Sequence, residues 1–308
     1  HERTADSKLD LAGALILTAA FLMVSYTLFE SDEVPVVRLA LMVAIAALLF
    51  GLFAFVESRS ADPLIPLSIW RQPTFTGAIV AAFIFNGVMM GMLYLLALYL
   101  QTVGGLGAVD TAKVLIGATI AVIITNPVGA LLARRGRFLL PVVAGMLLIA
   151  LGCTGVLLGI KGDSNAVILG GLIVLGTAVG IQTTPVATLQ VSSAGAKKGT
   201  ASGVVAITFG LSTAMGIALA TAIMQNVAIG SLQGATSSHQ LEGVDHQELL
   251  SILSGIRPMS DLSSAGQQVL TAAFDKGAMM TSAIFAVLAL LGAVVALKTL
   301  RDIILHES

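Results

Sequence analysis

The sequence carries little charge for its length. Asp, Glu, Lys and Arg make up 11% of its 308 residues, whereas apolar residues make up 56%. Soluble globular domains carry about 25% charged residues, so this chain lacks the polar shell that a soluble domain of its size requires. Its formal net charge is −1, which leaves no basic footprint for nucleic acid. Soluble folds and nucleic-acid binding are therefore excluded.

Cysteine and histidine are scarce as well. The one cysteine, Cys153, excludes an internal disulfide and falls within an apolar run, where we expect a small packing residue. His239 and His246 lack the close spacing of a zinc site, so we expect no metal and no cofactor. None of the four histidines lies in an apolar run, so Ser202, in a Gly-Thr-Ala-Ser-Gly stretch, has no activating base. The sequence predicts that the protein is not an enzyme.

Long apolar runs dominate what is present. Eight of them have about the 20-residue length that crosses a hydrocarbon core, and none alternates with the period of two of a barrel strand. Only helices then satisfy every backbone hydrogen bond within the bilayer. We expect an all-α, multi-pass protein of the lipid bilayer, with eight transmembrane helices at approximately residues 10–29, 36–56, 74–100, 110–133, 138–160, 166–189, 201–227 and 272–298.

A short arginine cluster with glycines at both ends separates two of these runs. It begins at Gly129 and includes Arg134, Arg135, Gly136 and Arg137. Three guanidinium groups cannot lie in hydrocarbon, so the cluster marks a tight loop at the membrane surface. Lys and Arg gather in cytoplasmic loops; with this loop inside, eleven of the sixteen basic residues fall inside and five outside. We therefore expect a cell-membrane protein in which both ends of this sequence are cytoplasmic.

Charge is absent from the middle of all eight runs. A proton-driven transporter needs a titrating group within the membrane, so we expect any proton site to lie outside this chain. We expect Asp275 and Lys276 to be solvated anchors at the outer end of the last run. The polar side chains left at membrane depth are amides and hydroxyls, chiefly Asn86, Gln182 and Thr183. They either bond neighbouring helices to one another or line a substrate cavity.

Two prolines and a methionine bear on the second interpretation. Pro127 and Pro185 fall inside the fourth and sixth runs, where a missing N–H favours a kink that shapes a cavity or a gate. Met90 adds a flexible, polarizable surface suited to varied apolar ligands, although core packing explains it equally well. The substrate-cavity candidates are Asn86, Met90, Gln182 and Thr183.

Two connections divide the chain. Residues 58–73 are proline-rich and amphipathic, which is typical of a linker on the cytoplasmic membrane surface, with Trp70 at the headgroup level. Residues 228–271 form the one long loop, which is mildly acidic and falls on the outer side in the predicted topology. We expect a helix pair within residues 1–57 and a six-helix bundle within residues 74–308.

The arginine cluster resembles the loop motif of the major facilitator superfamily, which places an acidic residue and several basic residues between glycines. Ala133 stands where the motif has Asp, and Phe138 stands where it has a basic residue. A weakened copy of this kind is typical of the C-terminal half of such proteins. The matching positions are Gly129, Leu131, Arg134, Gly136 and Arg137.

Other stretches resemble one branch of that superfamily, the fourteen-helix drug:proton antiporters of the EmrB/QacA type. Residues 9–17 resemble the start of their seventh helix, and residues 62–75 resemble the linker before their ninth helix. Residues 98–104 resemble the end of the ninth helix, and residues 199–218 resemble the thirteenth. Phe209 and Ser212 stand where Arg and Gly are common in the family. The matches follow one another in order along the chain.

The resemblance implies that residues 1–57 are an accessory helix pair and residues 74–308 a C-terminal six-helix bundle. The N-terminal six-helix bundle, with the carboxylates thought to carry the proton, is missing from this sequence. The implied activity is proton-driven export of small amphipathic or lipophilic compounds by alternating access, and hence multidrug efflux and antibiotic resistance. Two alternatives stay open: export of an endogenous lipid, siderophore or metabolite, and a non-transporting membrane half that acts as a scaffold.

Overall fold

Helices account for nearly all of the described chain. The computed structural model describes residues 11–30, 35–59, 72–192, 198–236, 251–253, 255, 259 and 262–307, and no strand occurs among them. The predicted all-α class is therefore confirmed for this part of the chain. Its long helices are α1 (Leu11–Glu30), α2 (Val36–Arg59), α3 (Pro73–Thr102), α4 (Ala108–Arg134), α5 (Leu139–Lys161), α6 (Asn165–Ser192), α7 (Lys198–Thr236) and α9 (Ser264–Glu307).

One helix stands at each of the eight predicted segments. Seven described helices are long and apolar enough to cross a membrane, whereas in α1 only the shorter stretch Leu15–Val24 is recognised as apolar. The chain is thus a multi-pass membrane protein by length and composition, with seven qualifying spans where we expected eight. Helices α7 and α9 extend beyond the predicted bounds into the range 228–271. Most of the predicted linker, residues 60–71, lies outside the described residues.

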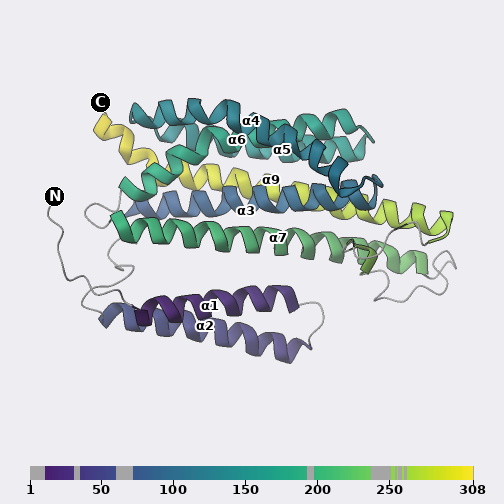
Figure 1. Cartoon of the computed structure of the whole chain (residues 1–308), viewed down its shortest axis with the longest axis horizontal. Coiled ribbons are helices and arrows are strands. Elements are labelled where there is room, and N and C mark those ends of the chain that lie inside the picture. Colours follow the sequence, from purple (N-terminus) through teal and green to yellow (C-terminus); the bar gives the residue numbers. More distant parts are fainter. Residues whose placement is uncertain are drawn as a thin grey trace.

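Successive helices alternate in direction, as Figure 1 shows. The arginine cluster at the end of α4 therefore lies at the same end of the molecule as the start of α3 and the end of α9. Helices α1 and α2 pack on each other and stand beside the other six (Figure 1). Their described contacts with the rest of the chain include those of α1 with α7 and a small apolar cluster, in which Leu17 and Phe53 meet Phe75 and Ile79 of α3.

The other six helices follow a repeated packing pattern. Helix α6 packs against α4 and α5, and α3 packs in the same way against α7 and α9. The contacts of α3 with α6 and of α5 with α9 join the two sets. Exchange of the triplet α3–α4–α5 with the triplet α6–α7–α9 maps these contacts onto one another, as in the paired three-helix repeats of transporters. The exchange is approximate, because the packing of α7 on α9 has no comparable counterpart between α4 and α5.

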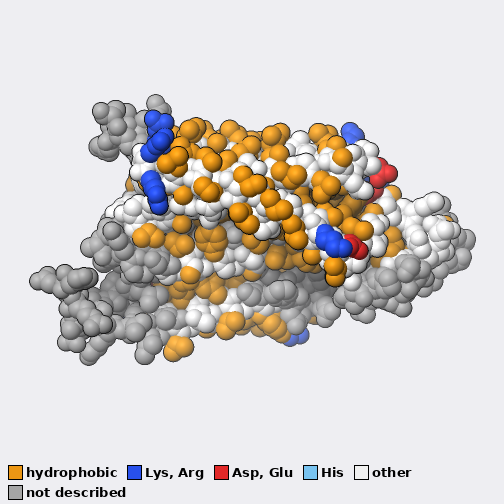
Figure 2. All heavy atoms as spheres, turned by 45° about the horizontal axis from the view of Figure 1, so that its top comes forward, with side chains coloured by type: hydrophobic (Ala, Val, Ile, Leu, Met, Phe, Trp, Pro, Cys, Tyr) orange, Lys and Arg blue, Asp and Glu red, His pale blue; other side chains and the backbone are white. Residues whose placement is uncertain are grey.

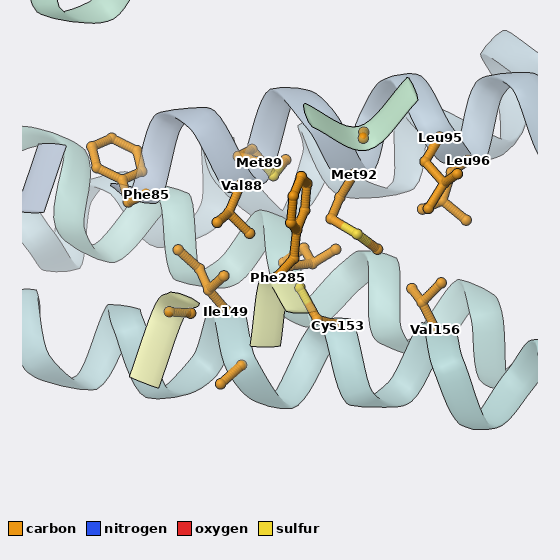
Figure 3. Packing of buried hydrophobic residues seen from close by; sticks show 14 of the residues in the cluster. Phe85, Val88, Met89, Met92, Leu95, Leu96, Ile149, Cys153, Val156 and Phe285 are labelled. Carbon is orange, nitrogen blue, oxygen red and sulfur yellow. The ribbon is translucent and has the colours of Figure 1, made fainter. Parts of the chain in front are cut away.

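The core of this bundle lies between α3, α5 and α9. Phe85 and Met92 of α3, Cys153 of α5 and Phe285 of α9 are each at most 2% exposed, and Figure 3 shows Phe285 projecting between α3 and α5. Cys153 is a free, buried cysteine among apolar neighbours. Its predicted role as a small packing residue is confirmed.

Glycines bring α3 and α7 unusually close. A Cβ built on Gly216 would overlap the backbone carbonyl of Gly87, and a Cβ on Gly87 would lie 3.1 Å from the carbonyl oxygen of Ser212. Small residues of this kind let helix backbones approach within a bilayer. A Cβ on Gly203, in contrast, would meet nothing within 4 Å, so close packing does not extend along α7 to that position.

The surface of the bundle suits a bilayer. In Figure 2 the charged side chains lie toward the ends of the helices, and hydrophobic side chains cover the length between them. Large apolar side chains such as Ile123, Leu151 and Val287 are more than half exposed. An apolar surface of this extent marks contact with lipid or with another membrane-embedded body rather than with water.

Candidate functional site

Asn86 lies halfway along α3 and bonds that helix to α7. Its Nδ2 lies 2.7 Å from Ser212 Oγ, 2.9 Å from Thr213 Oγ1 and 3.0 Å from the carbonyl oxygen of Phe209. Both hydroxyls donate their own protons to that same carbonyl. They can therefore only accept from Asn86, which fixes the amide nitrogen toward α7. The side chain is thus an interhelical hydrogen-bonding group, one of the two roles that the sequence left open.

Because the three hydrogen bonds orient the amide nitrogen of Asn86 toward α7, they also set the position of the amide oxygen, Oδ1. Within the described part of the chain, Asn86 Oδ1 makes no hydrogen bond, and it is not among the fully buried polar atoms that lack a partner. It is therefore an acceptor at membrane depth that keeps some exposed surface. The residue as a whole is only 4% exposed and lines neither of the two hollows described below, so contact of Asn86 with a substrate stays a prediction.

Gln182 faces a neighbouring helix. Its side chain is 0% exposed and lies against Gly145 of α5, where a Cβ would come within 2.7 Å of the Gln182 carboxamide carbon. Neither of its side-chain polar atoms has a hydrogen-bond partner in the described residues, and the same holds for Gln190 on the same helix. A buried amide without a partner costs about 1–3 kcal/mol. Contact of Gln182 with a substrate stays a prediction that this orientation does not favour.

Thr183, one residue further along α6, lines an open hollow of about 550 Å³. Its hydroxyl donates to the carbonyl of Val179 at 2.6 Å, so its oxygen retains acceptor capacity toward the hollow. Met90, on α3, is only partly buried. Contact of either residue with a substrate stays a prediction. The wall of the hollow comes from α6 alone: Thr183, Thr184, Ala187, Thr188, Val191 and Ser192.

The two helix-interior prolines lie beside a hydrogen bond that joins α4 to α6. Thr184 donates to Asn126 Oδ1 at 3.1 Å, and these residues directly precede Pro185 and Pro127. Proline interrupts the helical hydrogen-bond ladder, so both helices are weakened at the level where this bond holds them together. Neither the bond nor its place beside the prolines was predicted from the sequence.

The arginine cluster is built as a helix end. Helix α4 ends at Arg134, and Gly136 has φ +74. The N–H of Gly136 donates to Ala133 O, and the N–H of Arg137 donates to Leu132 O. These bonds are the glycine-dependent C-terminal cap. The three arginines are exposed and form no salt bridge among the described residues, so they remain available to solvent, lipid headgroups or another protein segment.

An apolar cavity between α3, α7 and α9 was not predicted from the sequence. Its volume is about 380 Å³, within the range of small-molecule sites. Gly87 and the buried Phe285 line it, together with Met215 and Leu219, each of which is about 40% exposed. Ser212, which accepts the hydrogen bond from Asn86, also lines it. The cavity exists because the close approach of α3 and α7 depends on side chains too small to fill it.

The environment of Asp275 differs from the one expected from the sequence. This residue was expected to be a solvated anchor, but it is only partly exposed and accepts a hydrogen bond from Tyr99 of α3, at 3.0 Å. Asp110, at the start of α4, is the anchor-like case: it is exposed and pairs with Lys113 at 2.6 Å. The interaction of Asp275 joins residues 176 positions apart, so no local pattern in the sequence signals it.

The comparison with protein families agrees with this architecture. The family model of the Major Facilitator Superfamily matches residues 11–217, and the chain belongs to that superfamily. That superfamily consists of membrane transport proteins rather than enzymes. The match begins within the first helix of the pair α1–α2 and extends into α7.

Among curated proteins, relatives named for drug resistance match the chain. Multidrug resistance protein Stp of Mycobacterium tuberculosis is 28% identical over 221 residues, which cover 70% of this chain and 41% of Stp. Quinolone resistance protein NorB of Staphylococcus aureus is 26% identical over 237 residues, which cover 73% of this chain and 51% of NorB. The chain thus spans about half, or less, of the length of these relatives.

Proposed function

We propose that this chain is the C-terminal portion of a proton-driven multidrug exporter of the fourteen-helix type. The similarity to Stp and NorB, over about half of their length, supports this proposal. On this account α1 and α2 are the accessory pair and α3 to α9 form one six-helix bundle. The paired three-helix packing of that bundle, with its separate α1–α2 pair, supports this division.

The proposal depends most on the hollow along α6, which lies beside the hydrogen bond between α6 and α4. The hollow extends along α6 from Thr183 to Ser192, toward the end of that helix. Here the hydroxyl of Thr183 faces an open hollow, and directly beside it Thr184 bonds to Asn126 between two prolines. The wall of this hollow offers hydrogen-bond acceptors to a small amphipathic molecule. It also has a level at which α4 and α6 can bend together during alternating access.

The cargo that suits this chain is largely apolar with a few donors. The cavity beside Gly87 is lined almost entirely by carbon, and Asn86 Oδ1 and Thr183 Oγ1 are acceptors at membrane depth. No carboxylate accompanies them among the described residues that line either hollow. We propose amphipathic or lipophilic compounds as substrates. Export of an endogenous lipid, siderophore or metabolite would use the same surfaces.

The orientation is also proposed. The excess of basic residues near the end of α4 supports a cytoplasmic position for that end, together with the start of α3 and the end of α9. Tyr99 and Asp275 then lie toward the outer face. Exposed arginines at the end of α4 agree with a surface that meets water and anionic headgroups.

A resistance panel tests the function. The complete gene product, expressed in a host without its own drug exporters, should raise the inhibitory concentrations of several unrelated lipophilic drugs and quinolones. It should also speed the efflux of ethidium, and a protonophore should abolish both effects. Unchanged resistance and efflux, with the protein present in the membrane, would contradict the proposal and favour the scaffold alternative.

A further inference from the structure

We propose that Asp275 is a proton-binding site at the outer end of the bundle, through which protons act on the link between α9 and α3. The inference rests on the proposed function and on the proposed orientation. It departs from the expectation that every proton site of the transporter lies outside this chain. Its basis is the interaction between Asp275 and Tyr99.

Tyr99 is buried inside the bundle rather than placed in an aromatic belt. Belt tyrosines lie at the membrane surface with their rings toward lipid, whereas Tyr99 is 8% exposed and its ring lies 6.0 Å from that of Phe274. A buried tyrosine hydroxyl requires a hydrogen-bond partner. Asp275 Oδ1, 3.0 Å away on α9, provides it.

The carboxylate of Asp275 reaches both the interior and the surface. It is partly exposed, with the exposed Lys276 next to it on α9, so protons from the outer solution can reach it. On its inner side it meets Tyr99 of α3, and Asp163, in the turn between α5 and α6, acts on it electrostatically. The sequence also places Arg257 and Asp261 before α9, at positions outside the described residues.

Protonation of this carboxylate changes the strength of the link. An ionised carboxylate accepts a charge-assisted hydrogen bond from the phenol, which is roughly twice as strong as a neutral one. A proton that binds Asp275 gives a neutral carboxylic acid, and the bond from Tyr99 weakens. The outer ends of α3 and α9 are then held less firmly to each other. Proton binding is thereby coupled to a movement of helices, as an antiporter requires.

Two described positions before α9 contact the helices that form the link. A Cβ on Gly255 would come within 2.8 Å of the Leu98 side chain, and Thr271 Oγ1 lies 3.5 Å from the sulfur of Met259. Gly255 therefore lies next to the residue before Tyr99 on α3, and Met259 contacts α9 one turn before Asp275.

The test uses the complete gene product, purified and placed in liposomes with ethidium as the probe. Two quantities are measured: exchange of ethidium at equal pH on both sides, and its accumulation when a pH gradient is imposed. The variants are Asp275→Asn, Asp275→Glu and Tyr99→Phe. Asp110→Asn is the matched control, because Asp110 lies in the first turn of α4, which starts at the same end of the bundle as α9 (Figure 1), but is exposed and paired with Lys113 on its own helix.

We expect Asp275→Asn to keep exchange within about twofold and to lose gradient-driven accumulation by about tenfold or more. Asp275→Glu should restore part of the accumulation, Tyr99→Phe should shift its pH dependence, and Asp110→Asn should behave as wild type. Wild-type accumulation in Asp275→Asn would overturn the proton site. Loss of exchange together with accumulation would also overturn it, because the bond would then serve structure alone. If the wild type neither exchanges nor accumulates ethidium, the proposed transport function itself fails.

Discussion

Gly129 of α4 lies against the backbone carbonyl of Ile181 in α6, so close that a Cβ on Gly129 would overlap the oxygen. That carbonyl is the one that Pro185 leaves without a helical donor, because proline at position i cannot bond the carbonyl at i−4. This close approach explains why a glycine, rather than a larger residue, stands at the first position of the arginine-cluster motif. The glycine lets α4 approach the weakened turn of α6.

Gly129→Ala should accordingly destabilise the protein. The added methyl group must displace backbone atoms of α6, and overpacking of this kind costs about 1–3 kcal/mol. We expect a lower melting temperature in detergent, measured by intrinsic fluorescence. Gly170→Ala on α6 is the control, since a Cβ there meets nothing within 4 Å. Equal melting temperatures for the two variants would contradict the account of Gly129.

The bond between Thr184 and Asn126 should contribute a measurable coupling. Double-mutant cycles of buried polar pairs in a membrane protein average about 0.6 kcal/mol, with a maximum of about 1.7. We predict a value in this range for Thr184→Val combined with Asn126→Ala, measured by unfolding in denaturing detergent. Additive effects would show that the bond at 3.1 Å holds α4 and α6 together no more strongly than packing does.

Asn86→Ala should change which compounds are exported more than it changes stability. Ser212 and Thr213 keep their own donor bonds to Phe209 without the amide, so no hydroxyl proton loses its partner. We expect an altered resistance profile at unchanged expression, with the largest loss for compounds that carry hydrogen-bond donors. The control is Asn226→Ala, whose amide is exposed and bonds within its own helix. An unchanged profile for every drug would count against a cavity role for Asn86.

Site-directed labelling tests the orientation. Cys153 is 0% exposed, so the background reaction with a maleimide should be low. A cysteine introduced at exposed Asp163, between α5 and α6, should react in intact cells with an impermeant reagent. A cysteine at exposed Arg135, after α4, should react only after permeabilisation. The reverse pattern would invert the proposed topology.

The helices were predictable because apolar runs of membrane-spanning length leave the backbone no alternative. The direction in which each side chain points was not. Helix α6 is apolar on almost every side, so nothing in its own sequence shows that Gln182 faces α5 while Thr183 faces a hollow. That choice is made by Gly145, whose missing side chain leaves room for the Gln182 amide.

Long-range polar contacts were equally inaccessible from the sequence. Tyr99 and Asp275 lie 176 positions apart, and a carboxylate near a helix end has the same local sequence whether it is solvated or bonded to another helix. The glycine of the arginine cluster was recognisable as part of a motif, whereas its partner, the carbonyl of Ile181, emerged only from the packing of α4 on α6.

The most direct test of the central claim, proton-driven export, uses everted membrane vesicles that contain the complete gene product. An imposed pH gradient, acid inside, should drive ethidium uptake without ATP, and addition of ethidium should speed the decay of the gradient. Both effects should vanish with a protonophore and in vesicles that lack the protein. Ethidium uptake that persists after the gradient is collapsed, or a gradient that ethidium leaves unchanged, would contradict the account.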